Sequence, residues 1–284
     1  MRRDPRPRRR AAHLEVVRRP VRSTTAGSLV SNRRRATIGE VAPLNLPDDL
    51  ERQISASVAQ YWRTRGRQSE HQRHGARVDQ GLRSAVTGGA QMDGFVDLLA
   101  AIATANGAPA ASVFRKKGVE IPGFFRPTKE WDLLIVRKGR LIAAIEAKSH
   151  VGPSFGNNFN NRTEEAMGSA LDVWTAYREG AFEAGPQPFL GYFFMLEDCK
   201  ASQSPVRVKE PHFRVLPEFK GASYAKRYEL FCRKLVRERH YQAASFLTSR
   251  SDSGLEGQYT EPAADLSVSS FLVALAGHVS ANVS

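Results

Sequence analysis

The chain has 284 residues, 41% of them hydrophobic and 25% charged, so it is long enough and apolar enough to bury a sizeable core. Its apolar runs fall short of the roughly 20 residues of a membrane-spanning helix, and two cysteines exclude a disulfide framework and fit a reducing cytosol. The formal net charge is +13, but residues 1–35 carry 12 arginines against Asp4 and Glu15, which leaves only +3 for the rest and makes net charge weak evidence for nucleic-acid binding.

Residues 1–40 are predicted to form a disordered, arginine-rich tail in front of a single domain formed by residues 41–284. The start, MRRDPRPRRR, has no apolar core after its charges, unlike a secretory signal. Pro5, Pro7 and Pro20 oppose the amphipathic helix of a mitochondrial transit peptide. Such a tail would add non-specific affinity for phosphate groups.

The first half of the domain is predicted to contain two helices followed by two strands. Residues 44–68 form an amphipathic pattern that Pro47 and Asp48 open, and residues 92–107 form a second one that ends near Gly107. The apolar runs WDLLIV (131–136) and RLIAAIEAK (140–148) predict strands on either side of a basic turn.

The second half is predicted to alternate in the same way. PSFGNNFNN (153–161) is expected to be a loop, and a helix with Thr163 as its N-cap follows and stops at Gly180. The apolar run at 188–198 predicts a central strand, and helices are expected at about 224–247 and 266–279. Helices that flank a short mixed β-sheet indicate the α/β class.

Three charged residues interrupt the apolar hairpin, where charges are costly unless they are paired. Glu146 and Lys148 point to one face of their strand, because side chains alternate along a strand. Asp132 joins them only if the turn has the right parity. A two-residue turn between straight strands would put Asp132 opposite Ile145, on the wrong face. We therefore predict a bulge or a three-residue loop at 137–139, with Val136 paired with Arg140.

With that register, two carboxylates and one ammonium group converge. Two neighbouring carboxylates repel each other unless a cation lies between them, and Mg²⁺ with its preference for oxygen ligands is the natural occupant. The backbone carbonyl of Ala147 would be a further ligand, and Lys148 would orient a water or offset charge on a phosphate. These parts suit hydrolysis of a phosphodiester. The alternative is that Asp132, Glu146 and Lys148 form salt bridges on an exposed face.

The pattern resembles the PD-(D/E)xK nuclease superfamily, with Asp132, Glu146 and Lys148 as its acids and lysine. Trp131 stands where the superfamily usually has proline. The segments RPTKEWDLLIV, LIAAIEAKSHVGPSFGNNFNNRTEEA and DVWTAYREGAF resemble the XhoI family of type II restriction endonucleases, and the resemblance extends from about Arg77 almost to the C-terminus. A third acid from an upstream helix is found in some superfamily members, and the candidates here are Glu70, Asp79, Asp93 and Asp97.

The resemblance implies a restriction-endonuclease-like fold and Mg²⁺-dependent cutting of both DNA strands at the palindrome CTCGAG in a prokaryotic cytoplasm. A palindrome is read most simply by a two-fold homodimer, and a DNA methyltransferase that protects the same site is implied. Asparagine and arginine favour adenine and guanine in the major groove, so base contacts are expected from a group that directly follows the catalytic strand: Asn157, Asn158, Asn160, Asn161 and Arg162. Some of these asparagines would instead build turns or cap the next helix.

Two other functions remain open from the residues: a DNA-binding protein of the same fold that does not cut, and a nuclease for repair or for DNA junctions. His150 is expected to be a solvated loop histidine rather than a base or a metal ligand. Four cations before the first catalytic strand would either contact phosphates or form a solvated face: Lys116, Lys117, Arg126 and Lys129.

Overall fold

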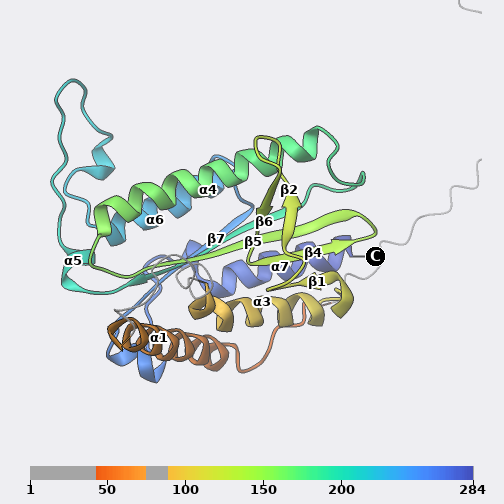
Figure 1. Cartoon of the computed structure of the whole chain (residues 1–284), viewed down its shortest axis with the longest axis horizontal. Helices are drawn as coiled ribbons and strands as arrows, with labels where there is room; N and C mark the ends of the chain where they lie inside the picture. The colour runs from red at the N-terminus through yellow and green to blue at the C-terminus, as the bar shows by residue number, and fades with distance from the viewer. Residues whose placement is uncertain (1–42, 75–88, 284) are drawn as a thin grey trace, which may run out of the picture. The chain divides into compact units, whose positions relative to one another are not determined.

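A five-stranded mixed sheet forms the centre of the computed structural model, which describes residues 43–74 and 89–283 (Figure 1). The strand order is β1-β4-β5-β6-β7, with β1, β4 and β5 antiparallel and β5, β6 and β7 parallel. The strands are β1 (Val113–Phe114), β4 (Leu133–Arg137), β5 (Arg140–His150), β6 (Phe189–Glu197) and β7 (Ala243–Ser249). A separate two-stranded sheet consists of β2 (Glu120–Pro122) and β3 (Thr128–Glu130). The predicted tail, residues 1–40, lies outside the described residues.

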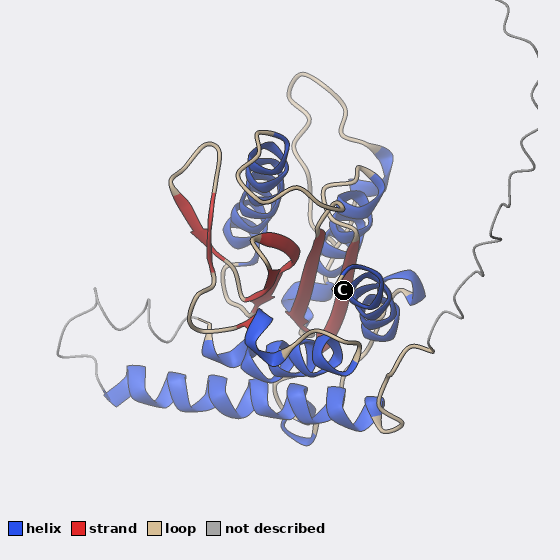
Figure 2. Cartoon of the chain, turned by 90° about the vertical axis from the view of Figure 1, so that its right-hand side faces the viewer, coloured by secondary structure: helices blue, strands red, loops and turns tan. Residues whose placement is uncertain are grey.

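Helices cover both faces of the five-stranded sheet, which confirms the predicted α/β class. In Figure 1, α4 and α6 lie above the sheet and α1, α3 and α7 below it, and Figure 2 shows the β2–β3 hairpin projecting beside the strands. The helices are α1 (Leu50–His74), α3 (Asp93–Ala105), α4 (Phe155–Arg178), α5 (Lys200–Gln203), α6 (Tyr224–Arg237) and α7 (Val268–Asn282). Single 3₁₀ turns lie at Ala90–Met92, Ala110–Ser112, Pro217–Phe219, Ser253–Glu256 and Ala264–Leu266. Among these helices none is both long and apolar enough to cross a membrane.

Strand β6 separates two hydrophobic cores, because its side chains alternate between them. Phe193 and Met195 pack with α1, α3 and α7, whereas Tyr192 and Phe194 pack with α4 and α6. A strand that is buried on both faces is a nearly continuous apolar run, which is why this strand was predictable as central.

The β4–β5 hairpin has the predicted bulge but not the predicted three-residue loop. Arg137 pairs with Arg140 around the two-residue turn Lys138-Gly139, whose φ angles are 50° and 74°. Both positive values match the primed turns that suit the twist of a hairpin, so the shorter loop is favoured. Ile135 pairs with Ala143 while Val136 pairs with Leu141, and Ile142 is left as an extra residue.

The bulge changes the register beyond it and decides where Asp132 lies. Leu133 pairs with Ile145, and the Asp132 N–H donates to the Ile145 carbonyl at 3.2 Å. Asp132 therefore lies across from Glu146 rather than from Ala144, and on the same face of the hairpin.

The predicted loop at 153–161 was wrong, because α4 begins at Phe155. Phe155 is buried and Phe159 is packed against the same core, so burial of an apolar face outweighs the weak helix propensity of the asparagines between them. Thr163 is consequently inside the helix, where its hydroxyl donates to the Phe159 carbonyl at 2.8 Å, and is not an N-cap.

The predicted helix at 224–247 was too long. Helix α6 ends at Arg237, Arg239 takes a left-handed φ of 59°, and residues 243–249 form β7 beside β6. Phe246 and Leu247 are each fully buried but point to different cores, which a strand with helices on both faces permits.

Candidate active site

The structure brings the three predicted acidic and basic residues together at the open end of the β4–β5 hairpin. Lys148 Nζ lies 3.4 Å from Asp132 Oδ2 and 3.2 Å from Glu146 Oε1. The Ala147 N–H donates to Asp132 Oδ2 at 2.8 Å, which fixes the aspartate against β5. The bulge at Ile142 is what allows this convergence, since a straight hairpin would have sent Asp132 to the other face.

The electrostatic environment keeps the central pair charged. Burial raises the pKa of Glu146, which is 4% exposed, but Lys148 and Lys129 outweigh that effect and hold its pKa below the ordinary value. Burial lowers the pKa of Lys148, but Glu146 and Asp132 raise it by more, so the net shift is upward. At neutral pH the site therefore holds a carboxylate and an ammonium group in contact.

Lys129 is a second cation at the same carboxylate, and the sequence indicated it only as one of four residues that would meet phosphates. It extends from β3, is 12% exposed, and places Nζ 3.1 Å from Glu146 Oε1 and 4.6 Å from the centre of the Trp131 ring. Tyr241, expected inside a helix, instead places its hydroxyl 3.4 Å from Glu146 Oε2. The β2–β3 hairpin brings Lys129 to Glu146, and the turn between α6 and β7 brings Tyr241 there. Neither contact has a local sequence signal.

The donor set suits a hard divalent cation. Asp132 and Glu146 supply two carboxylates, and the carbonyl of Ala147 faces the same strand edge as its N–H, beyond Leu133, the first residue of β4. Within residues 43–74 and 89–283, no group of three or more His, Cys, Asp or Glu side chains could hold a metal ion. Mg²⁺ fits such a set because it is bound through one or two carboxylates and keeps several waters.

The structure gives no support to a third acid from upstream. Asp93 and Asp97 both lie on α3 and form ion pairs with Lys116, at 2.9 Å, and with Arg115 respectively. Asp79 lies outside the described residues, and the side chain of Glu70 is not described either.

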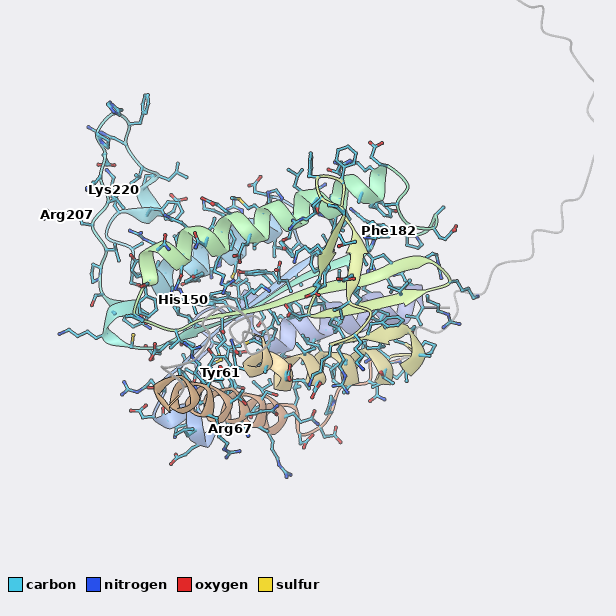
Figure 3. All side chains as sticks on the ribbon, in the orientation of Figure 1. Tyr61, Arg67, His150, Phe182, Arg207 and Lys220 are labelled. Atoms are coloured by element: carbon cyan, nitrogen blue, oxygen red, sulfur yellow. The ribbon has the colours of Figure 1, made fainter. Side chains whose placement is uncertain are left out.

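A polar hollow of about 200 Å³ adjoins the end of β5, between α1 and the first turns of α4. Its lining consists of Tyr61, Arg65, Gln91, Ser149, His150, Val151, Asn158 and Arg162. Figure 3 shows Tyr61 and His150 on facing sides of this region. Two arginines and no acid line the hollow, and Arg162 is also paired with Glu165 outside the lining at 2.7 Å. The lining itself is basic, which suits an anion such as a phosphate group.

The five residues expected to contact bases divide between two surfaces of α4. Asn158 and Arg162 line the polar hollow, whereas Asn157, Asn160 and Asn161 are exposed to solvent on the same two helical turns. None of the asparagines builds a loop, since all of them are helical. The first turns of α4 therefore present an amide-rich surface directly after β5.

His150 is the last residue of β5 and is 3% exposed, so the expectation of a solvated loop histidine was wrong. Its Nδ1 lies 2.8 Å from the Tyr228 hydroxyl, and its ring packs against Phe155. Burial and the nearby Arg162 lower the pKa of His150 to about 4. With this pKa, His150 is neutral at physiological pH. Its side chain packs between β5, α4 and α6.

Asp172 on α4 holds the hairpin that carries Lys129. Its side chain is 1% exposed and accepts hydrogen bonds from the Phe124 and Phe125 N–H groups, each at 2.8 Å, and from Arg126 Nε at 2.7 Å. Burial raises the pKa of Asp172, but these three donors lower it by more, so that the net shift is downward. Arg126 is thus paired within the protein.

A basic segment that the sequence analysis did not single out connects α5 to α6. Residues 204–223 include exposed Arg207, Lys209 and Arg214, and Phe213 is 87% exposed. Figure 3 shows Arg207 and Lys220 where this segment projects beyond the end of α4. The alternation of cations with an exposed aromatic residue in RVKEPHFRV was the available signal.

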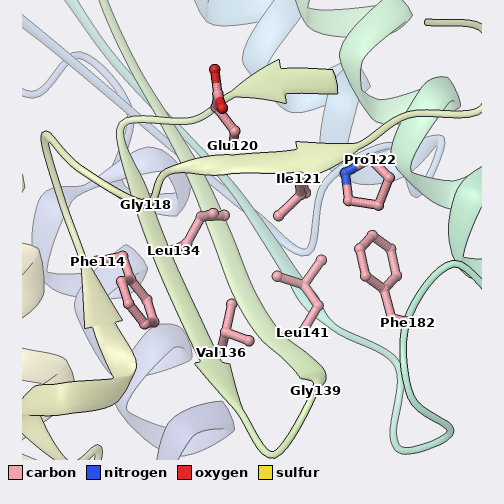
Figure 4. A pocket seen from close by; sticks show the side chains of 10 residues that line it. All are labelled: Phe114, Gly118, Glu120, Ile121, Pro122, Leu134, Val136, Gly139, Leu141 and Phe182. Atoms are coloured by element: carbon pink, nitrogen blue, oxygen red, sulfur yellow. The ribbon is translucent and has the colours of Figure 1, made fainter. Parts of the chain in front are cut away.

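An apolar hollow of about 270 Å³ lies near the β4–β5 turn, away from the charged site. Figure 4 shows Ile121, Leu134, Leu141 and Phe182 facing into it. Glu120 is the single acidic side chain of its lining, so it lacks the paired carboxylates of the candidate site.

Comparisons with known proteins show which sequences this chain is similar to. The family described as "Restriction endonuclease XhoI" matches residues 71–261. The type II restriction enzyme BstVI of Geobacillus stearothermophilus is 55% identical over 206 residues, 71% of this chain and 92% of that protein. The type II restriction enzyme XhoI of Xanthomonas vasicola is 48% identical over 190 residues, 66% of this chain and 76% of that protein. No solved structure matches.

Proposed function

Because the chain belongs to the XhoI family of restriction endonucleases and is a type II site-specific deoxyribonuclease, we propose that it cuts both DNA strands at CTCGAG with Mg²⁺ as cofactor. The observation that carries the proposal is the meeting of Asp132, Glu146 and Lys148 at the end of one bulged hairpin. A protein that only bound DNA would have no need to bury Glu146 in contact with a paired lysine.

Each residue of the proposed catalytic group has a distinct task. Asp132, Glu146 and the carbonyl of Ala147 would hold the Mg²⁺ ion, which when bound supplies a Lewis acid and makes a water easier to deprotonate. Lys148 lies between the two carboxylates, so its ammonium group is positioned to orient the attacking water or to offset charge on the phosphate. Asp132 is held for its role by the Ala147 N–H.

The polar hollow and α4 are proposed to bind the DNA. Arg162 and Asn158 in the hollow would hold the backbone beside the reacting phosphate, and exposed Asn157, Asn160 and Asn161 would reach base edges. The basic segment 204–223 would contact phosphates further along the duplex.

The palindrome implies a partner arrangement as well. We expect residues 41–284 to form one nuclease domain that acts as a two-fold homodimer, with one active site for each strand. A methyltransferase that modifies the same sequence would protect the host DNA, and the expected place of both enzymes is a prokaryotic cytoplasm. Both cysteines of this chain, Cys199 and Cys232, are free thiols, which is consistent with that location.

Digestion of a fully sequenced plasmid with the purified protein and Mg²⁺, followed by mapping of the ends, tests the proposal. We expect cuts confined to CTCGAG, none after chelation of the metal, and at least a hundredfold slower cutting by Asp132→Asn and Lys148→Met. Lys138→Gln removes an exposed lysine at the tip of the β4–β5 hairpin, at the other end from Glu146, and is the matched control that should cut normally. Binding without cleavage at any divalent metal concentration, or preferential cutting of branched DNA, would refute the proposal.

A further inference from the structure

Two ammonium groups share one buried carboxylate oxygen at the candidate active site. Lys129 Nζ and Lys148 Nζ lie 3.1 Å and 3.2 Å from Glu146 Oε1, and Lys148 also contacts Asp132. Asp132 and Glu146 are thereby balanced by two lysines, and the formal charge of the four side chains is zero. A metal site with a single lysine would instead keep a net negative charge, which attracts a cation.

This balance opposes a divalent ion in the protein without DNA. A bound Mg²⁺ would have to displace at least one ammonium group from Glu146 Oε1 and would leave both lysines close to a doubly charged cation. The site is also poorly hydrated, since Glu146 is 4% and Lys129 12% exposed, so solvent screens this repulsion weakly. A DNA phosphate adds negative charge at the same place and gives a displaced lysine a new partner.

Lys129 is the lysine placed to change partners. Lys148 sits on the same strand as Glu146 and bridges both carboxylates. Lys129 contacts only the Glu146 carboxylate, donates to the Glu130 carbonyl at 3.0 Å as well, and comes from the separate β2–β3 hairpin. The centre of the Trp131 ring lies 4.6 Å from the Lys129 ammonium group, and the face of such a ring attracts cations. Lys129 therefore has a second favourable contact beside it when it leaves the Glu146 carboxylate.

We propose that Lys129 couples metal binding to DNA binding: its ammonium group occupies Glu146 in the DNA-free enzyme and moves to a DNA phosphate when the metal enters. The idea rests on the proposed function of this site. Its consequence is that the enzyme binds Mg²⁺ weakly until DNA is present. By thermodynamic linkage, a divalent ion must then strengthen DNA binding by the same factor by which DNA strengthens metal binding.

Calorimetric titration of the DNA-free protein with Mg²⁺ tests the coupling without any catalytic readout. Lys129→Gln and Lys129→Met, which remove the charge, should bind Mg²⁺ at least about tenfold more tightly than the wild-type chain. Lys129→Arg keeps the charge, and Lys138→Gln removes an exposed charge at the tip of the β4–β5 hairpin, so both should match the wild-type chain. Circular dichroism would establish that all four variants are folded. Agreement between Lys129→Gln and Lys129→Met would show that the change in Mg²⁺ affinity comes from loss of the charge and not from the particular side chain introduced.

A second titration measures the linkage directly. Fluorescence anisotropy of a CTCGAG duplex, with Ca²⁺ or with chelator, should show that the divalent ion strengthens DNA binding several-fold more in the wild-type chain than in Lys129→Gln. Unchanged or weaker Mg²⁺ binding by both neutral variants, including no detectable binding at millimolar Mg²⁺, would overturn the inference. If the neutral variants bind Mg²⁺ no more tightly but the wild-type chain cuts CTCGAG, the proposed function stands and the coupling by Lys129 fails. If the variants behave as expected but the wild-type chain cuts no plasmid, the proposed function fails instead.

Discussion

Replacing Asp172 tests whether the β2–β3 hairpin is held to α4 by one buried carboxylate. Asp172→Ala removes the acceptor of two backbone N–H groups and of Arg126. A hydrogen bond to a charged acceptor contributes about 1.5 kcal/mol or more, so the two N–H groups account for about 3 kcal/mol. The half-exposed Arg126 adds at most about 1 kcal/mol, because its pairing is screened by solvent. Asp172→Asn keeps a neutral acceptor and should lose about half as much.

Urea unfolding at several pH values measures this effect. The pKa of Asp172 is lower in the folded than in the unfolded chain, so its contribution is fully present above about pH 4 and disappears as the pH falls through its folded-state pKa. The difference between the wild-type chain and Asp172→Asn should therefore shrink in acid. Arg250→Gln, which breaks an exposed ion pair with Asp252 and keeps the hydrogen bond from the Ser253 N–H to Asp252, is the control and should leave the midpoint nearly unchanged.

The reasoning about the hairpin would be refuted by either of two results. One is an Asp172→Ala protein that unfolds at the wild-type urea concentration at pH 7. The other is a stability loss that stays constant down to pH 2, because an acceptor that titrates cannot give it. Hydrogen exchange at the Phe124 and Phe125 amides would locate the loss, since these two groups should exchange faster in the variant.

Three further outcomes follow from the structure. Burial and Arg162 lower the pKa of His150 to about 4, so the unfolded chain binds the proton first and the free energy of unfolding should fall by up to about 3 kcal/mol between pH 6.5 and pH 4. Urea midpoints of His150→Gln should not show this part of the fall. Gly168→Ala should raise stability by about 0.5–1 kcal/mol, since an added Cβ on this exposed helical residue meets nothing within 4 Å; a lower melting temperature would contradict it. Gly191→Ala should lower stability by about 1–3 kcal/mol, because the new Cβ would come within 2.6 Å of the Phe271 ring, and an unchanged melting temperature would show that the core yields.

Elements with a strong local pattern were predictable from the sequence. Helix α3 ends before Gly107, which takes a φ of 103°, and β6 has the apolar run of a strand buried on both faces. The errors arose where tertiary contacts decide. The asparagines at 157, 158, 160 and 161 are helical because Phe155 and Phe159, which are interspersed with them, pack into the core. Residues 243–249 form a strand because they pair in parallel with β6. This pairing depends on the tertiary arrangement and is not visible in the local sequence pattern.

The candidate site was predictable up to the question of parity. Alternation places Glu146 and Lys148 on one face, and the requirement that Asp132 join them leads to an irregularity in the hairpin, although not to its position. The segment RKG is compatible with a two-residue turn and with a three-residue loop. Lys138 and Gly139 both take left-handed φ angles and form the two-residue turn, so the bulge at Ile142 supplies the register shift that brings Asp132 to the face of Glu146.

The position of the bulge has a physical advantage over a longer loop. An extra residue in the turn would shift every pair of the hairpin, whereas an extra residue at Ile142 leaves Arg137 and Arg140 paired at the tip and changes the register only beyond it. The bulge also bends β5 before it reaches Glu146, so the end that carries the charges can be directed independently of the turn. Lys129 reaches Glu146 from a different sheet and adds a second cation to the group. The extra residue Ile142 thus decides whether Asp132 lies on the same face as Glu146 and Lys148.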